Sequence, residues 1–63
     1  MKIIYHVFTN EMDEWFENYD EAFKLYSDWC KEFETARLYK EERDEDGEVL
    51  NEYCLESFGE YPM

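Results

Sequence analysis

Apolar residues along this chain follow two different spacings, and the change of spacing predicts the order of the elements. Ile3–Thr9 is β-branched and aromatic with apolar residues at consecutive positions, which is typical of a strand covered on both sides. Between Trp15 and Phe33, apolar residues recur at three- and four-residue steps, the pattern of an amphipathic helix. We place that helix at about Tyr19 to Glu34, with Asn18 as its N-cap and Glu21 at the capping-box position. Asn10, with Asp13 three residues on, is a weaker alternative start, and Glu14 to Glu17 form an extended or helical lead-in.

The C-terminal half predicts a β-hairpin. The segments Ala36–Arg43 and Glu48–Phe58 flank Asp44-Glu45-Asp46-Gly47. Asp-Gly is a strong hairpin signal, because both central residues of a type I′ turn must accept a positive φ. A two-residue turn centred on Asp46-Gly47 places Leu38 opposite Leu55 and Tyr39 opposite Cys54. The same register sets Glu41 against Glu52, which is unfavourable because like charges repel across a ladder.

Together these segments predict a single α+β domain over residues 1–63, in the order β-α-β-β. Its three-stranded sheet carries one amphipathic helix packed on one face, while Asn10 to Glu14 is a polar break and Gly59 to Met63 an irregular tail. One helix leaves the other face of the sheet uncovered, and an exposed apolar patch rimmed by charge often marks an interface. The candidates for that uncovered face are Tyr5, Val7, Tyr39 and Cys54. The aromatic stripe of the helix, in contrast, is expected to be core.

Charge sets the class of partner. The chain has 18 Asp and Glu against six Lys and Arg, a formal net charge of −12, yet it is 21% aromatic and can therefore build a core. Such a body favours a cationic partner, which could be a basic protein groove, a metal ion or a polyamine, and it disfavours nucleic acid and anionic membranes. The start of the chain does not resemble a signal peptide, and no stretch is apolar enough for a membrane span. We therefore expect a cytoplasmic protein with free thiols at Cys30 and Cys54.

No pattern in the sequence indicates catalysis, a metal site or a cofactor. Glu42-x-Asp44-x-Asp46-Gly47 resembles the start of a calcium loop, but the position of the bidentate Glu is occupied by Tyr53, so a solvated acidic turn is the better interpretation. His6 stands alone in a strand, where packing or hydrogen bonding is its more frequent role. We therefore expect no enzyme, no cofactor and no metal.

Two acidic blocks, Glu11–Glu21 and Glu41–Glu48, dominate the surface charge. If they lay on one side, their charge density would be comparable to that of a DNA duplex. In size, charge, aromatic content and lack of a catalytic motif, the chain resembles the small acidic phage proteins that inhibit host nucleases, namely anti-CRISPR proteins and anti-restriction DNA mimics. That resemblance implies a place in a basic nucleic-acid-binding groove of the target, inside a bacterial host cell.

The leading hypothesis is therefore a non-enzymatic inhibitor that occupies the nucleic-acid groove of a host defence protein, either a CRISPR effector or a restriction nuclease. The alternative is a small acidic bacterial module for protein interaction or homodimerisation, docking through the open face of its sheet. Carboxylates clustered on one side favour the first hypothesis, and dispersed carboxylates around an apolar sheet patch favour the second. The candidate partner-binding residues are Asp13, Glu14, Glu17, Glu41, Glu42, Asp44, Glu45 and Tyr39.

Overall fold

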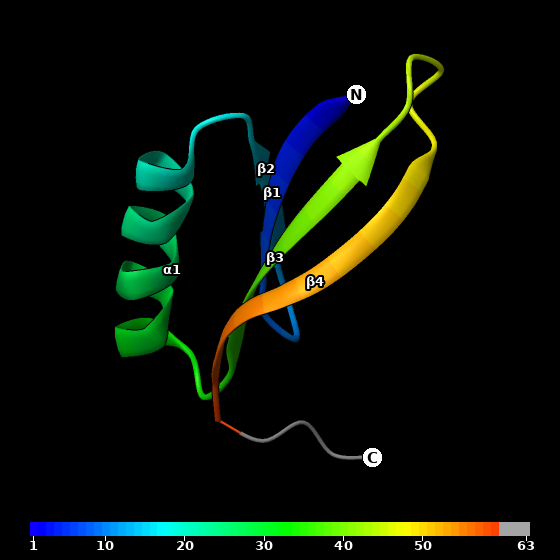
Figure 1. The fold of residues 1–63 in the computed structure, drawn as a ribbon. Coiled ribbons are helices and arrows are strands. Elements are labelled where there is room, and N and C mark those ends of the chain that lie inside the picture. The colour runs from blue at the N-terminus through cyan, green and yellow to red at the C-terminus, as the bar shows by residue number, and fades with distance from the viewer. Residues whose placement is uncertain (60–63) are drawn as a thin grey trace.

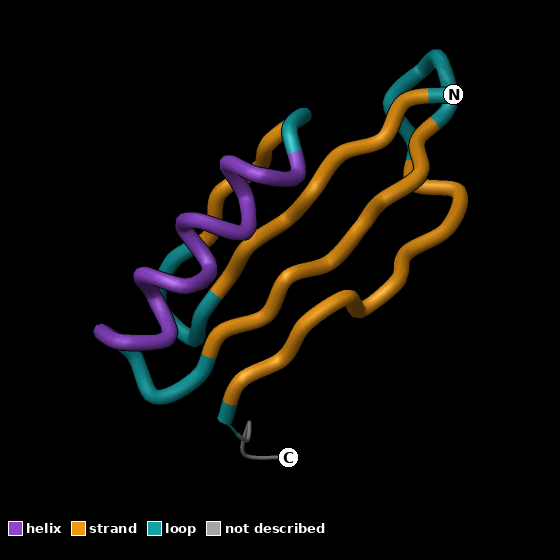
Figure 2. The backbone as a smooth tube through the Cα atoms, turned by 60° about the vertical axis from the view of Figure 1, so that its left-hand side comes forward, coloured by secondary structure: helices purple, strands orange, loops and turns teal. Residues whose placement is uncertain are grey.

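β1 (Lys2–Phe8) lies in the interior of the sheet although it is the first element of the chain. A computed structural model describes residues 1–59, in which β1, β2 (Asp13–Phe16), β3 (Ala36–Arg43) and β4 (Val49–Phe58) form an antiparallel sheet ordered β2-β1-β3-β4. The helix α1 (Tyr19–Glu32) lies across one face of that sheet, as Figures 1 and 2 show. The α+β class with one helix is confirmed within the described residues, but the prediction of three strands is wrong. The tail beyond Gly59 lies outside the described residues.

The additional strand, β2, occupies the segment that the sequence assigned partly to a polar break and partly to the helical stripe. Thr9 closes the β1–β2 turn: its hydroxyl accepts from the backbone N–H groups of Glu11 and Met12, and its own N–H donates to the Met12 carbonyl. β2 then pairs with β1 in antiparallel register, with Phe16 opposite Tyr5 and Trp15 opposite His6. Because side chains of a strand alternate between faces, Trp15 and Phe16 point to opposite sides of the sheet.

The start of α1 follows the sequence prediction closely. Asn18 has an extended backbone, and its side-chain oxygen accepts from the Glu21 N–H over 3.1 Å, as an N-cap requires. The helix ends at Glu32, two residues earlier than expected, because Phe33 leaves helical geometry. Its inner face contributes Ala22, Tyr26 and Trp29 to the core. The outer part of the aromatic stripe is not core, since Tyr19 and Phe23 remain about two-fifths exposed.

The core lies between α1 and one face of the sheet. Val7 and Leu38 are fully buried there, and Tyr5 packs against the same cluster. Tyr5 and Val7 were expected on the uncovered face, and that prediction is wrong. Both faces of β1 are apolar, and α1 packs against the face that carries Val7. Tyr39 and Cys54 face each other across β3 and β4, on the opposite side of the sheet from Leu38, as predicted.

The β3–β4 hairpin keeps the predicted register only in its middle. Tyr39 opposes Cys54 and Glu41 opposes Glu52, but register shifts follow on both sides, so Leu38 pairs with Glu56 instead of Leu55. The turn is not type I′, since within the described residues only glycines have a positive φ. Instead Gly47, with φ +88°, donates its N–H to the Asp44 carbonyl in a wider turn. A β-bulge in β4 accounts for the first register shift, since Leu55 has no direct partner in β3.

Candidate interaction surface on the open face of the sheet

The sheet face opposite α1 carries a line of stacked rings that runs from β2 across β1 to β3. Trp15 stacks on His6 with centroids 4.4 Å apart and planes 5° from parallel. His6 lies 4.7 Å from the Phe8 ring, and Phe8 lies 5.3 Å from the Tyr39 ring. We call these four residues, Trp15, His6, Phe8 and Tyr39, the aromatic row. Within residues 1–59 no helix or strand covers it, so the row lies on a face available to a partner.

Tyr39 ends the row beside Cys54 of β4. Its partial burial raises the pKa of the Tyr39 phenol, and the neighbouring Cys54 acts in the same direction. The phenol is therefore neutral at physiological pH, and Tyr39 offers an apolar ring with a polar tip, the combination enriched at protein interfaces. Tyr39, a partner-binding candidate from the sequence, lies on the uncovered face.

Glu41 lies on this same face but is not available to a partner. Only 4% of the residue is exposed, and its Oε1 accepts from Arg43 Nε over 2.9 Å and also from the second guanidinium nitrogen. Its other oxygen, Oε2, is 3.6 Å from His6 Nδ1. A buried carboxylate needs such partners, because an isolated one would lose too much hydration energy. Glu41 therefore holds the Arg43 side chain in place on the open face and lies beside His6, instead of binding a partner.

The remaining acidic candidates of the second block are also separated from one another. Glu42 points to the other side of β3, where its Oε1 accepts from Asn51 Nδ2 and the Tyr53 hydroxyl. Asp44 uses Oδ1 to accept the backbone N–H groups of Asp46 and Glu48, so it shapes the turn. Glu45 is exposed at the tip. The candidates Glu41, Glu42, Asp44 and Glu45 thus occupy four different environments.

β2 divides the first acidic block. Asp13 is on the open face, with Oδ2 3.5 Å from His6 Nε2, whereas Glu14 is exposed on the helix side opposite Val7. Glu17 follows β2 and forms a 2.8 Å ion pair with Lys2. The hydrogen bond and charge of Lys2 hold the pKa of the Glu17 carboxyl below its usual value.

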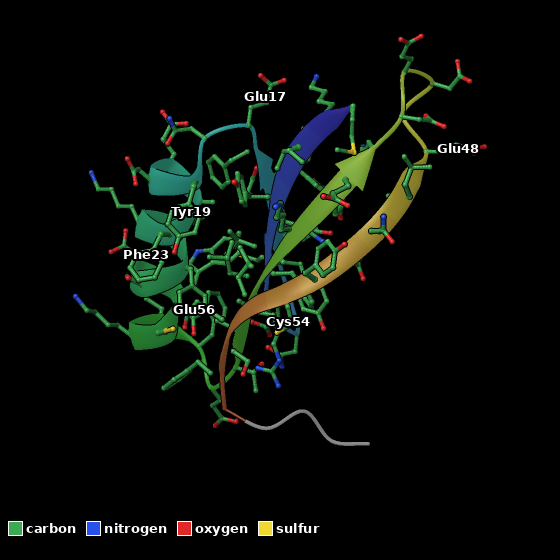
Figure 3. The ribbon with its side chains drawn as sticks, in the orientation of Figure 1. Glu17, Tyr19, Phe23, Glu48, Cys54 and Glu56 are labelled. Carbon is green, nitrogen blue, oxygen red and sulfur yellow. The ribbon has the colours of Figure 1, made fainter. Side chains whose placement is uncertain are left out.

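The acidic residues are therefore not grouped in space as they are grouped in the sequence. Lys2 binds Glu17 and pairs with Arg43 in the sheet, so the β2–α1 junction and the β3–β4 tip flank the start of β1. Figure 3 shows Glu17 and Glu48 at this same end of the molecule. The β1–β2 turn with Glu11 lies at the other end, as Figure 1 shows. The complete blocks do not share one side, but parts of both share one end.

A hollow of about 270 Å³ adjoins the aromatic row at the β1–β2 turn. Its walls combine rings, carboxylates and turn residues, and no Lys or Arg is among the residues that line it. They are His6, Phe8, Thr9, Asn10, Glu11, Met12 and Asp13.

Most of this surface could not be predicted, because Trp15 was counted in the apolar stripe that leads into the helix and His6 was treated as an isolated residue. The available signal was the period of two in β1, which puts His6 and Phe8 on one face. That signal could not reveal the stack with Trp15, since β2 itself was not anticipated.

Among residues 1–59, no three His, Cys, Asp or Glu side chains are grouped so that they could hold a metal ion. In the same part of the chain, α1 is too short and too polar to cross a membrane. Cys30 and Cys54 are free thiols, as expected.

Comparison of the chain with protein-family models, curated proteins and solved structures finds no match.

Proposed function

We propose that this protein is a non-enzymatic binding protein that engages a basic protein partner through the open face of its sheet. The observation that carries the proposal is the uncovered aromatic row in a chain with a net charge of −12. Aromatic side chains contribute strongly to protein interfaces because they bury a large area at small entropic cost. The surrounding carboxylates favour a cationic partner through electrostatic steering.

β4 forms the edge of the sheet next to this surface, and its side chains alternate between the open face and the helix side. Among the residues described, its large apolar side chains are unusually exposed, from 39% for Leu55 to 54% for Leu50. An edge strand of this length is a natural attachment site unless bulges or charges protect it. The β-bulge at Leu55 and the carboxylates of Glu52 and Glu56 provide such protection against a second copy of the same acidic chain. A basic partner would meet the same carboxylates as attractive charges.

The test uses two tyrosines on opposite faces of the sheet. Tyr39→Ser alters the aromatic row, while Tyr53→Ser removes an exposed ring from the other face. The protein is immobilised, a bacterial lysate is passed over it, and the amount of retained basic protein is measured at low and high salt. We expect Tyr39→Ser and high salt each to reduce retention severalfold, and Tyr53→Ser to leave it unchanged. Equal retention by both variants would contradict the proposal.

Nucleic-acid mimicry is the second candidate function, and one observation favours it. Acidic residues from the β2–α1 junction and from the β3–β4 tip lie at one end of the molecule, on either side of the start of β1. The target would be a host defence nuclease, as in the resemblance to anti-CRISPR and anti-restriction proteins. The exposed residues involved are Glu17, Asp20, Glu21, Glu45, Asp46 and Glu48.

Charge reversal at that end tests the mimic hypothesis. Glu45→Lys together with Asp46→Lys should abolish competition with a DNA duplex in a nuclease-inhibition assay across CRISPR effectors and restriction enzymes. Glu32→Lys together with Glu34→Lys changes the net charge equally near the C-terminus of α1 and serves as the control. Inhibition that survives the tip reversal would exclude mimicry by this end of the molecule.

A further inference from the structure

We propose that the outer edge of β4 is the docking site for an extended segment of the basic partner, rich in lysine or arginine, which pairs with β4 as a fifth strand. The inference rests on the proposed function for the basic character of the partner. The edge site itself rests on the structure of β4. Pairing of this kind recognises a segment largely through its main chain, so the partner needs an extended shape and positive charge.

β4 stays exposed along its whole length. All ten residues of Val49–Phe58 are exposed, whereas no residue of the neighbouring strand β3 is. Figures 1 and 2 show β4 at the rim of the sheet, away from α1. Leu50 and Leu55 leave large apolar side chains in solvent, at 54% and 39% exposure. A long edge strand with apolar side chains is a template for pairing with a further strand.

The main chain of β4 has an edge without a strand partner. Among residues 1–59, β3 is the only strand beside β4, and alternate residues of β4 direct their N–H and C=O groups away from it. The ladder with β3 is regular over residues 51–54, between two register shifts. Arg37 occupies the end of the strand, since its guanidinium donates to the carbonyls of Phe58 and Gly59. The stretch open to a partner is therefore residues 51–54, which suits a short peptide strand.

The charge of β4 selects a basic occupant over a second copy of the chain. β4 contains Glu52 and Glu56 and no Lys or Arg. Neither carboxylate is part of an ion pair among the described residues. Glu52 lies opposite Glu41, whose own carboxylate is bound by Arg43. A lysine or arginine on the other side of Glu52 would be attracted across the new ladder, whereas a second acidic strand would be repelled.

An added strand would also continue the open face of the sheet. Its side chains on that face would follow Glu52 and Cys54, beside Tyr39 of the aromatic row. On the other face, the Tyr53 hydroxyl donates to Glu42 Oε1 of β3 over 3.3 Å, so that ring is held over the sheet and the edge contact does not depend on it. The partner segment should therefore alternate basic residues with residues that favour strands.

The experiment is an NMR titration of the intact protein with a short acetylated and amidated peptide in which threonine alternates with lysine. The backbone amides of residues 51–54 report on the β4 edge, and those of the other edge strand, β2, are the internal control. We expect saturable shifts at residues 51–54, about tenfold slower hydrogen exchange of their outward amides at saturation, and no change in β2. Equal changes at both edges, or none at millimolar peptide, would overturn the proposal.

Two N-methylated forms of the peptide test the role of its main chain. Methylation at every second residue leaves one edge of the peptide free, while methylation at every residue blocks both edges, and both forms keep the positive charge. We expect the first form to bind within about threefold of the parent peptide and the second not to bind. A threonine–glutamate peptide should not bind either, because its charge is repelled. Binding of the fully methylated peptide would mean a contact without strand pairing and would overturn the proposal.

Two variants with the same change of charge locate the contact. Glu52→Gln should weaken binding of the lysine peptide about fivefold, because it removes a carboxylate from the β4 edge. Glu32→Gln removes an exposed carboxylate at the end of α1 and should leave the binding constant unchanged. The spectrum of each variant shows whether it is folded. Equal weakening by both would indicate an effect of net charge alone and would contradict a contact beside Glu52.

The oligomeric state separates a partner strand from a second copy. Light scattering of the free protein at the concentration of the titration should show a monomer. A dimer whose amides at residues 51–54 are protected before peptide is added would assign the edge to a second copy and overturn the proposal. A failed titration with intact Tyr39-dependent retention of basic protein would overturn the β4 site and leave the proposed function standing. Peptide binding without such retention would support the β4 site and overturn the proposed function.

Discussion

Trp15 and His6 stack face to face across β2 and β1, with ring centroids 4.4 Å apart and planes 5° from parallel. This contact holds the short edge strand β2 on the open face, while Phe16 holds it on the core side. Since Trp15 is still 49% exposed, the stack stabilises the fold and at the same time presents a ring to solvent.

The first prediction compares the two tryptophans. Trp15→Ala should lower the free energy of unfolding by about 1–2 kcal/mol, since it removes one aromatic pair and a half-exposed side chain. Trp29→Ala should cost about 3–5 kcal/mol, because Trp29 is only 6% exposed in the core. Urea denaturation followed by circular dichroism measures both. Equal losses would mean that Trp15 is a core residue, as its place in the helical stripe suggested.

The second prediction concerns the buried ion pair of Glu41 and Arg43. Arg43→Met should destabilise the fold by about 2 kcal/mol, because it leaves the Glu41 carboxylate buried without its guanidinium partner. Adding Glu41→Gln should recover part of that loss, since the amide is uncharged. A double-mutant cycle by urea denaturation gives the coupling energy. The exposed pair of Lys2 and Glu17 is the control and should show much weaker coupling. Additive losses for Glu41 and Arg43 would contradict the arrangement.

The third prediction compares the two glycines with positive φ. Gly47→Ala should cost about 1 kcal/mol, since an added Cβ meets nothing within 4 Å and only the backbone is strained. Gly59→Ala should cost more, because its Cβ would collide with the Glu34 carbonyl oxygen. Thermal unfolding of both variants tests the order, and Asp46→Ala should be close to wild type because Asp46 has no positive φ. The reverse order would refute the described path of the chain at Gly59.

The fourth prediction is a loss of stability at alkaline pH. Burial in the core, together with a hydrogen bond to Cys30, raises the pKa of Tyr26 to about 12. A group that releases its proton less readily when folded stabilises the fold below its unfolded pKa of 10.0, and that contribution is lost as the pH rises through the folded value. Stability should therefore fall between these two pH values.

Tyr26→Phe tests the assignment of this loss. Phenylalanine cannot ionise, so the variant should show a smaller decrease in urea stability over the same alkaline range. Tyr19→Phe is a suitable control, since Tyr19 is 41% exposed and outside the buried cluster. Identical alkaline profiles of wild type and Tyr26→Phe would show that another group is responsible.

Local signals in the sequence were sufficient for α1 and for the approximate limits of β3 and β4. The Asn18 cap acts within a few residues, so it can be recognised without the fold, and the Asp-Gly pair located the hairpin turn although not its type. β2 was missed because Trp15 and Phe16 also match the helical period and extend the stripe of α1. Nothing local distinguishes the two apolar faces of β1, since the choice depends on packing of Val7 against Leu38 and the helix.

The candidate site could be predicted only in part for a similar reason. Glu41 and Glu42 are neighbours in an acidic run, and composition treats them alike. Strand alternation sends them to opposite faces, where one is buried with Arg43 and the other binds exposed polar groups. Tyr39 was identified because its side of the hairpin followed from register. The hollow depends on the Thr9 turn and on β2, both of which appear only in three dimensions.

The interior position of β1 has a consequence for the order of assembly. β1 can form one ladder with β2 as soon as the first hairpin exists, but its other edge stays open until β3 arrives from beyond the helix. A lone two-stranded hairpin is marginal in water, so the first half of the chain should gain lasting structure only when the second half docks. Closing that long connection makes folding slower than for a chain of purely local contacts. Cleavage of the chain between α1 and β3 would then yield two fragments, each of which folds only when it binds the other.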